Sequence, residues 1–268
     1  MKLSEQQIRD FDENGYVVLR NLFSAEEIAA LSEDIGRLSS IDTDHIFRKG
    51  AIRTIYRAHE NDGPTASRVF HAAARVPRVL GPISQLLRDD QVYVYNSKIN
   101  GKDAVTGIPM LWHQDFGYWK LDRVPTPNMC TYMITLADVD ELSGCLYVIP
   151  GSHKLGTLKH LPDSTTTYHK QWVVAREEMI RILREGPKPV PLKYGAGSVV
   201  IFHSNLIHGS GHNLSGGDRW QIYFAYNPVA NKPAAVGIKR PDYMRSMNFA
   251  PLVTMPDDAI LAARRIAA

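Results

Sequence analysis

The sequence predicts a mostly β protein with a helical N-terminal layer, built as a sandwich or barrel. From Gln91 onward, short segments rich in β-branched and aromatic residues alternate with clusters of Gly, Pro, Asn, Asp and Ser, which is typical of strands joined by turns. Few helical patterns separate these segments, which favours a sandwich or barrel. Residues 1–90 carry mainly helical signals instead. We therefore expect a single domain over residues 1–268.

Composition narrows the class of protein. The chain has 268 residues, of which 44% are hydrophobic and 22% charged, so a disordered, collagenous or coiled-coil protein is excluded. The net charge is +3 without a long run of like charges, which predicts no nucleic-acid and no membrane partner. No apolar run approaches the roughly 18–20 residues of a membrane helix. Two cysteines and a polar first segment favour a cytoplasmic protein. The oligomeric state is left open.

The N-terminal layer is predicted element by element. Residues 16–19 form a short apolar run that indicates a strand. Ser24 and Glu27 have the spacing of a capping box, and apolar residues follow at helical spacing up to Leu38. Two further helices are expected over residues 64–74 and 77–87, the second with proline in its first turn.

The β core is predicted over residues 91–230. Its expected strands cover residues 91–100, 110–116, 129–136, 145–149, 190–193, 198–203 and 219–227. Residues 151–189 interrupt this pattern with a long insertion that contains one helical stretch at 176–184, and we expect it to act as a lid. The C-terminal segment 231–268 ends in a predicted helix, with acidic residues first and arginines last.

The most informative chemistry lies at His113-Gln114-Asp115. On a strand, residues i and i+2 share a face, so His113 and Asp115 are predicted side by side with Gln114 pointing away. An imidazole and a carboxylate on one rigid strand are two thirds of the 2-His-1-carboxylate triad that suits non-haem Fe(II). His208 is the best candidate for the third ligand, at the end of an apolar strand that enters a Gly-rich turn.

Each of these residues also has a simpler interpretation. A single His-x-Asp pattern is short, and one histidine alone is more often a hydrogen-bonded core or turn residue. The joint pattern is more specific, because Arg219 opens the strand after His208 and a guanidinium can bind a carboxylate in bidentate fashion. Gln221 and Tyr223 share the face of Arg219 and could line a pocket or pack in the core.

Several motifs together resemble one family. His113-Gln-Asp115, His208-Gly-Ser210 with Asn213, and Arg219 are similar to the phytanoyl-CoA dioxygenase family of Fe(II)/2-oxoglutarate oxygenases, and to its ectoine-hydroxylase-like branch in particular. The resemblance covers nearly the whole chain. Further matching segments lie at residues 8–19, 95–100, 112–119 and 148–153.

The resemblance implies the fold and the cofactors. The fold would be a double-stranded β-helix, that is, a cupin-like jelly roll. Fe(II) would be held by His113, Asp115 and His208, with O2 and 2-oxoglutarate as cosubstrates. The distal carboxylate of 2-oxoglutarate would bind Arg219 with help from Ser210. Asn100 is a further candidate on the cosubstrate side.

The resemblance also indicates a substrate side. Trp119 would lie near the substrate by analogy with ectoine hydroxylases. That branch carries a substrate-contacting glutamine where this chain has Asn96, and an acidic run where this chain has residues 121–125, which argues against ectoine itself. Lys98 lies on the same strand face as Asn96 and is either a site residue or a lysine that extends to solvent.

The expected function is hydroxylation of an unactivated C–H bond in a small metabolite, a free amino acid or related zwitterion. In this family a carboxylate ligand at position 115 favours hydroxylation over halogenation, and no separate protein acid or base is expected. The alternatives are desaturation, epimerisation or cyclisation of a natural-product intermediate at the same iron site, or hydroxylation of an acyl thioester. A non-enzymatic alternative is a jelly-roll module that binds a ligand without turnover.

Overall fold

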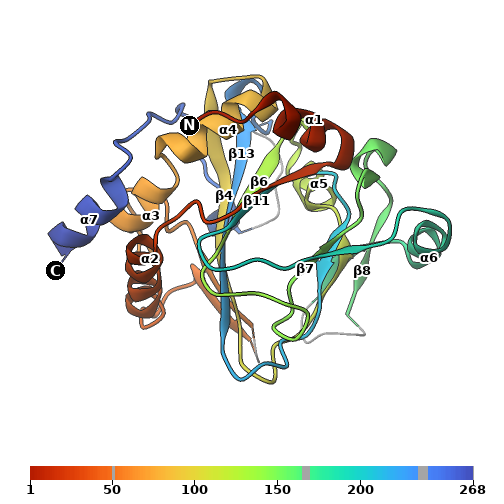
Figure 1. The fold of residues 1–268 in the computed structure, drawn as a ribbon, viewed down its shortest axis with the longest axis horizontal. Coiled ribbons are helices and arrows are strands. Elements are labelled where there is room, and N and C mark those ends of the chain that lie inside the picture. Colours follow the sequence, from red (N-terminus) through yellow and green to blue (C-terminus); the bar gives the residue numbers. More distant parts are fainter. Residues whose placement is uncertain (50–51, 165–169, 235–240, 268) are drawn as a thin grey trace.

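Two antiparallel sheets face each other in the computed structural model, which describes residues 1–49, 52–164, 170–234 and 241–267 (Figure 1). The larger sheet has the strand order β1-β11-β6-β13-β4-β3-β2 and the smaller sheet the order β10-β7-β12-β5. This arrangement is a jelly roll, so the predicted fold class is confirmed.

The larger sheet contains the longest strands. Its members are β1 (Tyr16–Leu19), β2 (Ile46–Lys49), β3 (Ile52–Tyr56), β4 (Val92–Lys102), β6 (Cys130–Thr135), β11 (Val199–His203) and β13 (Arg219–Pro228). The smaller sheet contains β5 (Met110–His113), β7 (Leu146–Val148), β10 (Val190–Leu192) and β12 (His208–Ser210). Each predicted strand of the core therefore exists, with shifted ends.

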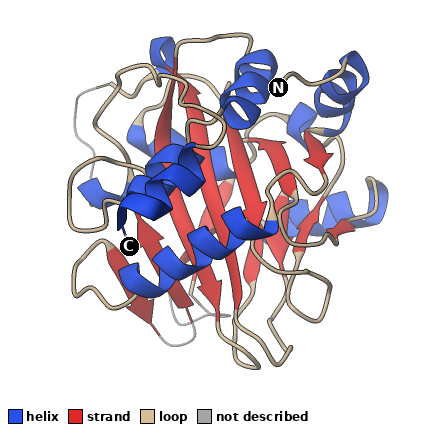
Figure 2. Cartoon of the chain, turned by 60° about the vertical axis from the view of Figure 1, so that its left-hand side comes forward, coloured by secondary structure: helices blue, strands red, loops and turns tan. Residues whose placement is uncertain are grey.

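Helices cover the outer face of the larger sheet, as Figure 2 shows. The covering helices are α2 (Ala25–Leu38), α3 (Arg68–Ala73), α4 (Pro77–Leu87) and α7 (Ala259–Ala267). Leu31 of α2 and Ile83 of α4 are buried in one cluster with Ile134 and Ile222 of the sheet. The outer face of this sheet is therefore apolar, which leaves the inner face for the site.

The inner faces of the two sheets pack together at one end. Met133, Val200 and Phe202 of the larger sheet contact Leu146 and Val148 of the smaller sheet in a buried apolar cluster. Towards the other end, polar side chains replace apolar ones and a cavity remains between the sheets.

The helix predictions are largely confirmed. Ser24 caps α2: its hydroxyl accepts a hydrogen bond from the Glu27 amide at 3.3 Å, and the Glu27 carboxylate accepts one from the Ser24 amide at 2.9 Å. The helix predicted at 77–87 is α4, and that at 176–184 is α6 (Arg176–Glu185). The C-terminal helix is α7, with arginines in its last turn. A further helix, α1 (Glu5–Asn14), precedes β1.

Two features of the first 90 residues differ from the prediction. The helix expected over 64–74 is α3, which begins only at Arg68 because the Ser67 side chain accepts from the Phe70 amide at 3.1 Å and caps it there. The region is also less helical than expected, since β2 and β3 form a hairpin that extends the larger sheet next to β4.

The insertion at 151–189 contains more regular structure than a loop. Strands β8 (His160–Asp163) and β9 (Gln171–Val174) form a hairpin that is followed by α6. The Gln171 side chain anchors β9 to the start of β5, because it accepts from the Leu111 amide at 2.8 Å and donates to the Pro109 carbonyl at 3.1 Å. Residues 165–169 lie outside the described residues. The lid function and the division of the chain into segments remain predictions.

No helix in the described residues is long and apolar enough to cross a membrane.

Candidate metal and cosubstrate site

Three buried side chains converge between the two sheets. His113, Asp115 and His208 each offer one potential ligand atom, and these three atoms lie within 4.8 Å of one another. The imidazole rings of His113 and His208 have their centroids 4.2 Å apart, and His208 Nε2 lies 4.0 Å from Asp115 Oδ1. Residues that are distant in sequence thus form the predicted 2-His-1-carboxylate arrangement, which suits Fe(II).

The two histidines are neighbours because their strands pair. His208 lies directly opposite His113 in the antiparallel ladder between β12 and β5. The prediction placed His208 at the end of an apolar strand, which is wrong. That strand, β11, ends at His203, and His208 opens the next strand after a turn that contains Asn205.

Asp115 is also placed differently from the prediction. Strand β5 ends at His113, and Asp115 is the first residue of the short helix α5 (Asp115–Trp119). Gln114 between them is still extended, so the two ligands face the same side as expected. A carboxylate is favourable in the first turn of a helix, and Thr131 Oγ1 of β6 donates a hydrogen bond to Asp115 Oδ2 at 2.8 Å.

Backbone carbonyls determine which nitrogen of each histidine is available. His113 Nδ1 lies 2.7 Å from the Leu111 carbonyl, and His208 Nδ1 lies 2.9 Å from the Leu206 carbonyl. A carbonyl can only accept, so each Nδ1 carries the hydrogen and each Nε2 keeps its lone pair. This is the tautomer that metal-binding histidines adopt, with the second nitrogen oriented by a carbonyl.

The protonation states suit a cation. Burial lowers the pKa of His113 to about 3, with a further contribution from His208, and burial also lowers the pKa of His208. Burial alone would raise the pKa of Asp115, but His208, Lys98, His113 and the Thr131 hydroxyl together lower it below its ordinary value. Two neutral imidazoles and one carboxylate are therefore present at neutral pH, and these groups fit a divalent iron ion.

The triad opens into a cavity of about 350 Å³ between the sheets. Four alternate residues of β4 line its floor: Asn96, Lys98, Asn100 and Lys102. Aromatic rings from β2, β3, α5 and β13 line its walls: Phe47, Tyr56, Tyr118, Trp119 and Tyr223. Eight of the nine predicted site residues, Ser210 and Arg219 among them, line this cavity. The ninth, His208, lines a smaller space that adjoins it, so the structure places all nine together.

Arg219 is a buried cation at one end of the cavity. Its guanidinium donates to Gln221 Oε1, which also accepts from the Tyr223 hydroxyl at 2.7 Å. Burial lowers the pKa of Arg219. Within the described part of the chain no carboxylate forms an ion pair with Arg219, and its Nε has no partner. A buried guanidinium without an anion is costly, so this end of the cavity fits an anionic ligand such as the distal carboxylate of 2-oxoglutarate.

Lys102 is a functional candidate that the sequence analysis missed. Its ammonium group donates to Ser210 Oγ at 2.8 Å and to the Gly211 carbonyl, and the residue lies opposite Arg219 in the β4–β13 ladder. Burial and the charge of Arg219 lower the pKa of Lys102 to about 6. The alternation of Asn96, Lys98 and Asn100 could have identified it, but the predicted strand ended at Asn100, two residues too early.

The remaining predicted residues have defined surroundings. Asn100 lines the floor, where its side-chain oxygen accepts from Thr54 Oγ1 at 3.1 Å. Trp119 is buried with its ring edge-on to Tyr95, at a centroid distance of 5.4 Å. Asn96 donates from Nδ2 to the Met244 carbonyl. Thr131, which holds Asp115, was also missed, because no local pattern distinguishes it from other strand threonines.

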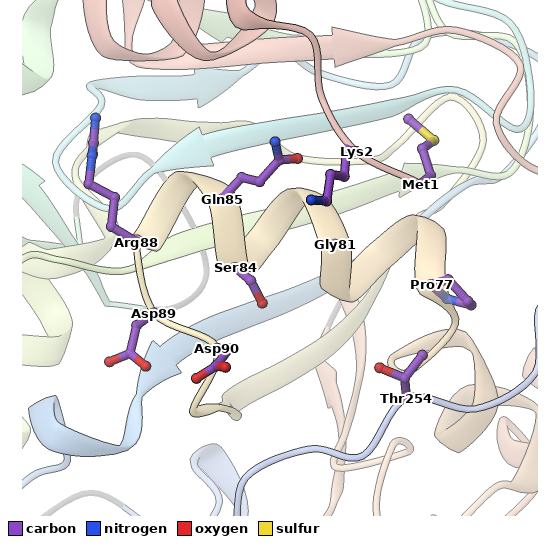
Figure 3. Close-up of a pocket in the computed structure, with 10 residues that line it drawn as sticks. All are labelled: Met1, Lys2, Pro77, Gly81, Ser84, Gln85, Arg88, Asp89, Asp90 and Thr254. Atoms are coloured by element: carbon purple, nitrogen blue, oxygen red, sulfur yellow. The ribbon is translucent and has the colours of Figure 1, made fainter.

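A second hollow, of about 670 Å³, lies at the surface beside α4 (Figure 3). The N-terminal residues Met1 and Lys2 pass close to the helix there, and a Cβ at Gly81 would lie 2.1 Å from the Met1 carbonyl oxygen. Gly81 thus permits this close approach. None of the residues that line the hollow belongs to the site cavity or to the cluster of potential metal ligands.

Comparisons with known proteins agree with this geometry. Residues 11–220 match the family described as phytanoyl-CoA dioxygenase (PhyH). An ectoine dioxygenase from Sphingopyxis alaskensis is 31% identical over 258 residues, which cover 90% of this chain and 82% of that protein. An L-proline trans-4-hydroxylase from Streptomyces griseoviridis is 28% identical, with 93% of this chain and 95% of that protein covered.

A solved structure is similar over the same range. The crystal structure of EctD from S. alaskensis with 2-oxoglutarate and 5-hydroxyectoine superposes with a TM-score of 0.80 at 28% identity, covering 95% of this chain and 88% of that one. The fold of this chain thus occurs in a protein whose structure contains 2-oxoglutarate.

Proposed function

The chain belongs to the phytanoyl-CoA dioxygenase family and is an iron- and 2-oxoglutarate-dependent dioxygenase, and we propose that it hydroxylates an unactivated C–H bond of a free amino acid or related zwitterion. The observation that carries the proposal is the buried triad, in which His113 and His208 present unprotonated Nε2 atoms beside the Asp115 carboxylate.

The roles of the residues follow from their positions. His113, Asp115 and His208 would hold Fe(II), and Thr131 would keep the carboxylate oriented. With iron, 2-oxoglutarate and O2 bound, one oxygen atom enters the substrate C–H bond and the other enters succinate, with release of CO2. The protein contributes position, because the reacting C–H must be held at the metal and water kept away.

The cosubstrate would occupy the basic end of the cavity. Arg219 and Lys102 would bind the distal carboxylate of 2-oxoglutarate, with Ser210 beside them. Asn100 lies next to this group on the floor. The substrate would then lie at the opposite end, against Asn96, Lys98 and Trp119.

The size of the cavity supports a small substrate. About 350 Å³ must hold both the cosubstrate and the substrate, which leaves room for a molecule of amino-acid size. The relatives named for ectoine and L-proline act on molecules of this size. The family resemblance implies that ectoine hydroxylases carry a substrate-contacting glutamine where this chain has Asn96, so we propose a substrate other than ectoine.

A substrate screen tests the proposal. Purified protein with Fe(II), 2-oxoglutarate and ascorbate is incubated with amino acids and related metabolites, and succinate and product mass are measured. We expect substrate-dependent succinate release with a product that gains one oxygen atom. A product that loses two hydrogen atoms would indicate desaturation or cyclisation, and an unchanged mass with altered chirality would indicate epimerisation.

Two variants test the metal site. His113→Ala and Asp115→Ala should abolish iron binding and turnover, because each removes a ligand. His212→Ala is the matched control, since His212 is exposed and lies outside the triad. Full turnover in either triad variant would contradict the proposal.

A further inference from the structure

A row of four polar residues on β4 forms the cavity floor. Asn96, Lys98, Asn100 and Lys102 alternate along the strand and therefore share its inner face. The register with β13 places Lys102 opposite Arg219 and Lys98 opposite Tyr223. The row thus carries two lysines in two different surroundings.

Lys98 and Lys102 lie at different ends of the cavity. At about 3.3 Å per residue, the backbone positions of Lys98 and Lys102 lie roughly 13 Å apart along the strand. Lys102 contacts Ser210 and faces Arg219, which is the anion site assigned to the cosubstrate. Lys98 lines instead the smaller adjoining space together with His113, Asp115 and His208, and the described lining of that space includes neither Lys102 nor Arg219.

The charges around the cavity are unbalanced. Among the described residues that line it, four are basic: Lys98, Lys102, Lys170 and Arg219. Lys102 and Arg219 are assigned to the cosubstrate, so Lys98 and Lys170 remain for the substrate. Asp115 is the acidic residue in that described lining, and it is committed to the metal and to Thr131. A cationic group on the substrate would therefore meet no carboxylate from these residues, whereas an anionic group would meet Lys98.

Asn96 adds a hydrogen-bond acceptor beside Lys98. Its Nδ2 donates to the Met244 carbonyl, which fixes the orientation of the amide. Its Oδ1 is buried and has no hydrogen-bond partner among the described residues, and Asn96 lines the cavity at 6% exposure. A buried acceptor of this kind is stabilised by a ligand that brings an N–H or O–H group.

We propose that Lys98 binds a carboxylate of the primary substrate while Asn96 Oδ1 accepts from its N–H or O–H group, and that the substrate carries a net negative charge. This inference rests on the proposed function and narrows it to anionic substrates of amino-acid size. These are acidic amino acids and, beyond the free amino acids named above, N-acylated ones, rather than neutral zwitterions. The reaction is unchanged: substrate C–H, 2-oxoglutarate and O2 give substrate C–OH, succinate and CO2.

Pairs of compounds that differ mainly in charge test the substrate class. Suitable pairs are L-glutamate with L-glutamine, L-aspartate with L-asparagine, and N-acetyl-L-proline with L-proline. Binding to the anaerobic complex with Fe(II) and 2-oxoglutarate is measured by calorimetry, and turnover by succinate release. We expect at least one anionic member to bind at least about tenfold more tightly than its neutral partner. Tighter binding of the neutral members, or no binding of any anionic member, would overturn the proposal.

Variants of Lys98 test its role, with the preferred compound of these pairs as substrate. Lys98→Gln should raise KM for this anionic substrate about 10- to 100-fold and leave KM for 2-oxoglutarate within about threefold. Lys98→Glu should shift the preference to the neutral member of a pair. Lys188→Gln, an exposed lysine outside the site, is the matched control and should change neither KM.

The outcomes separate the two proposals. If Lys98→Gln raises KM for 2-oxoglutarate and not for the substrate, Lys98 binds the cosubstrate and the inference is wrong while the proposed function stands. If the wild-type protein forms no succinate with any compound in the broader screen, the proposed function itself fails.

Discussion

Thr131 is the side chain that connects the metal carboxylate to the larger sheet. Its hydroxyl donates to Asp115 Oδ2 at 2.8 Å, and both residues are buried. Thr131→Val keeps the shape but removes this donor, so we expect iron affinity or kcat to fall about 10- to 100-fold, the usual effect of losing such a partner. Iron titration and steady-state kinetics measure both.

The control for this variant lies on the same strand. Thr135→Val removes a hydroxyl that donates to the Gly195 and Ser198 carbonyls, away from the triad. It should reduce stability and leave iron affinity unchanged. Equal iron affinity in Thr131→Val and wild-type protein would show that Asp115 is oriented without Thr131.

The lowered pKa of Lys102 predicts that cosubstrate binding depends on pH. Its pKa of about 6 means that it is mostly neutral at pH 7 before the anion binds. A carboxylate binds the protonated form, so 2-oxoglutarate should take up a proton on binding, and its affinity should fall by up to about tenfold per pH unit above this pKa. Calorimetry in buffers with different ionisation enthalpies measures the proton uptake.

Variants test whether Lys102 is the group that takes up the proton. Lys102→Met should abolish the proton uptake and weaken 2-oxoglutarate binding, whereas Lys188→Met should do neither. Binding without proton uptake in the wild-type protein near neutral pH would contradict the assignment of Lys102 to the cosubstrate.

The sequence could predict the residues whose chemistry is distinctive. His113, Asp115, His208 and Arg219 were identifiable from residue type, spacing and resemblance. Thr131 was not, because its role depends on a contact across the sheet. Lys102 depends on where β4 ends and on its register with Arg219, and strand ends are set by tertiary pairing.

At the scale of elements, the turn between β5 and α5 is held by one buried side chain. Gln114 donates to the Gly156 and Asn205 carbonyls at 2.8 and 2.7 Å and accepts from the Leu158 amide at 2.8 Å. These bonds connect the metal-ligand turn to two loops. The side chain that points away from the metal thus keeps both ligands in position.

Removing this side chain tests its contribution. Gln114→Leu leaves buried backbone groups without partners, so we expect a loss of about 2–4 kcal/mol in the free energy of unfolding, together with weaker iron binding. Urea denaturation measures the first effect. Gln6→Leu on the exposed face of α1 is the control and should change stability by less than about 0.5 kcal/mol. A stability change no larger than the control's would contradict this role.

The elements that the sequence analysis misjudged share a physical cause. The β2–β3 hairpin consists of two short strands whose partner is the edge of β4, so tertiary pairing rather than local pattern stabilises it. Helix α5 is a single short turn that interrupts an otherwise strand-like segment. By contrast, α2 and α4 were predicted because they carry local signals, a capping box and an N-terminal proline.

At the scale of the whole molecule, metal binding should stabilise the fold. The ligands come from separate parts of the chain, so they converge in the folded state and not in the unfolded chain. Iron(II) at about 100 times its Kd should add about 2.7 kcal/mol to the free energy of unfolding. Anaerobic thermal unfolding with and without iron, and after chelation, measures this. His113→Ala should show no such increase, and an equal increase in that variant would place the metal elsewhere.

Periodicity and turn residues alone predicted a sandwich or barrel with helices on one side. They did not distinguish a jelly roll, because the order of strands in a sheet depends on crossovers between distant segments. The family resemblance supplied that topology, and the structure confirms it with β13 between β4 and β6 at the centre of the larger sheet.

The three metal-ligand candidates are connected to two different sheets, and this has a mechanical consequence. His113 and His208 belong to paired strands of one sheet, whereas Asp115 is bonded to a threonine of the other. Any fluctuation that separates the two sheets would first strain the bond between Asp115 and the bound iron. The bonds from His113 and His208 to the iron would be strained less. Loss of iron would then be an early sign of loosening, ahead of global denaturation, and hydrogen exchange along β5 and β6 should slow together when the ion is added.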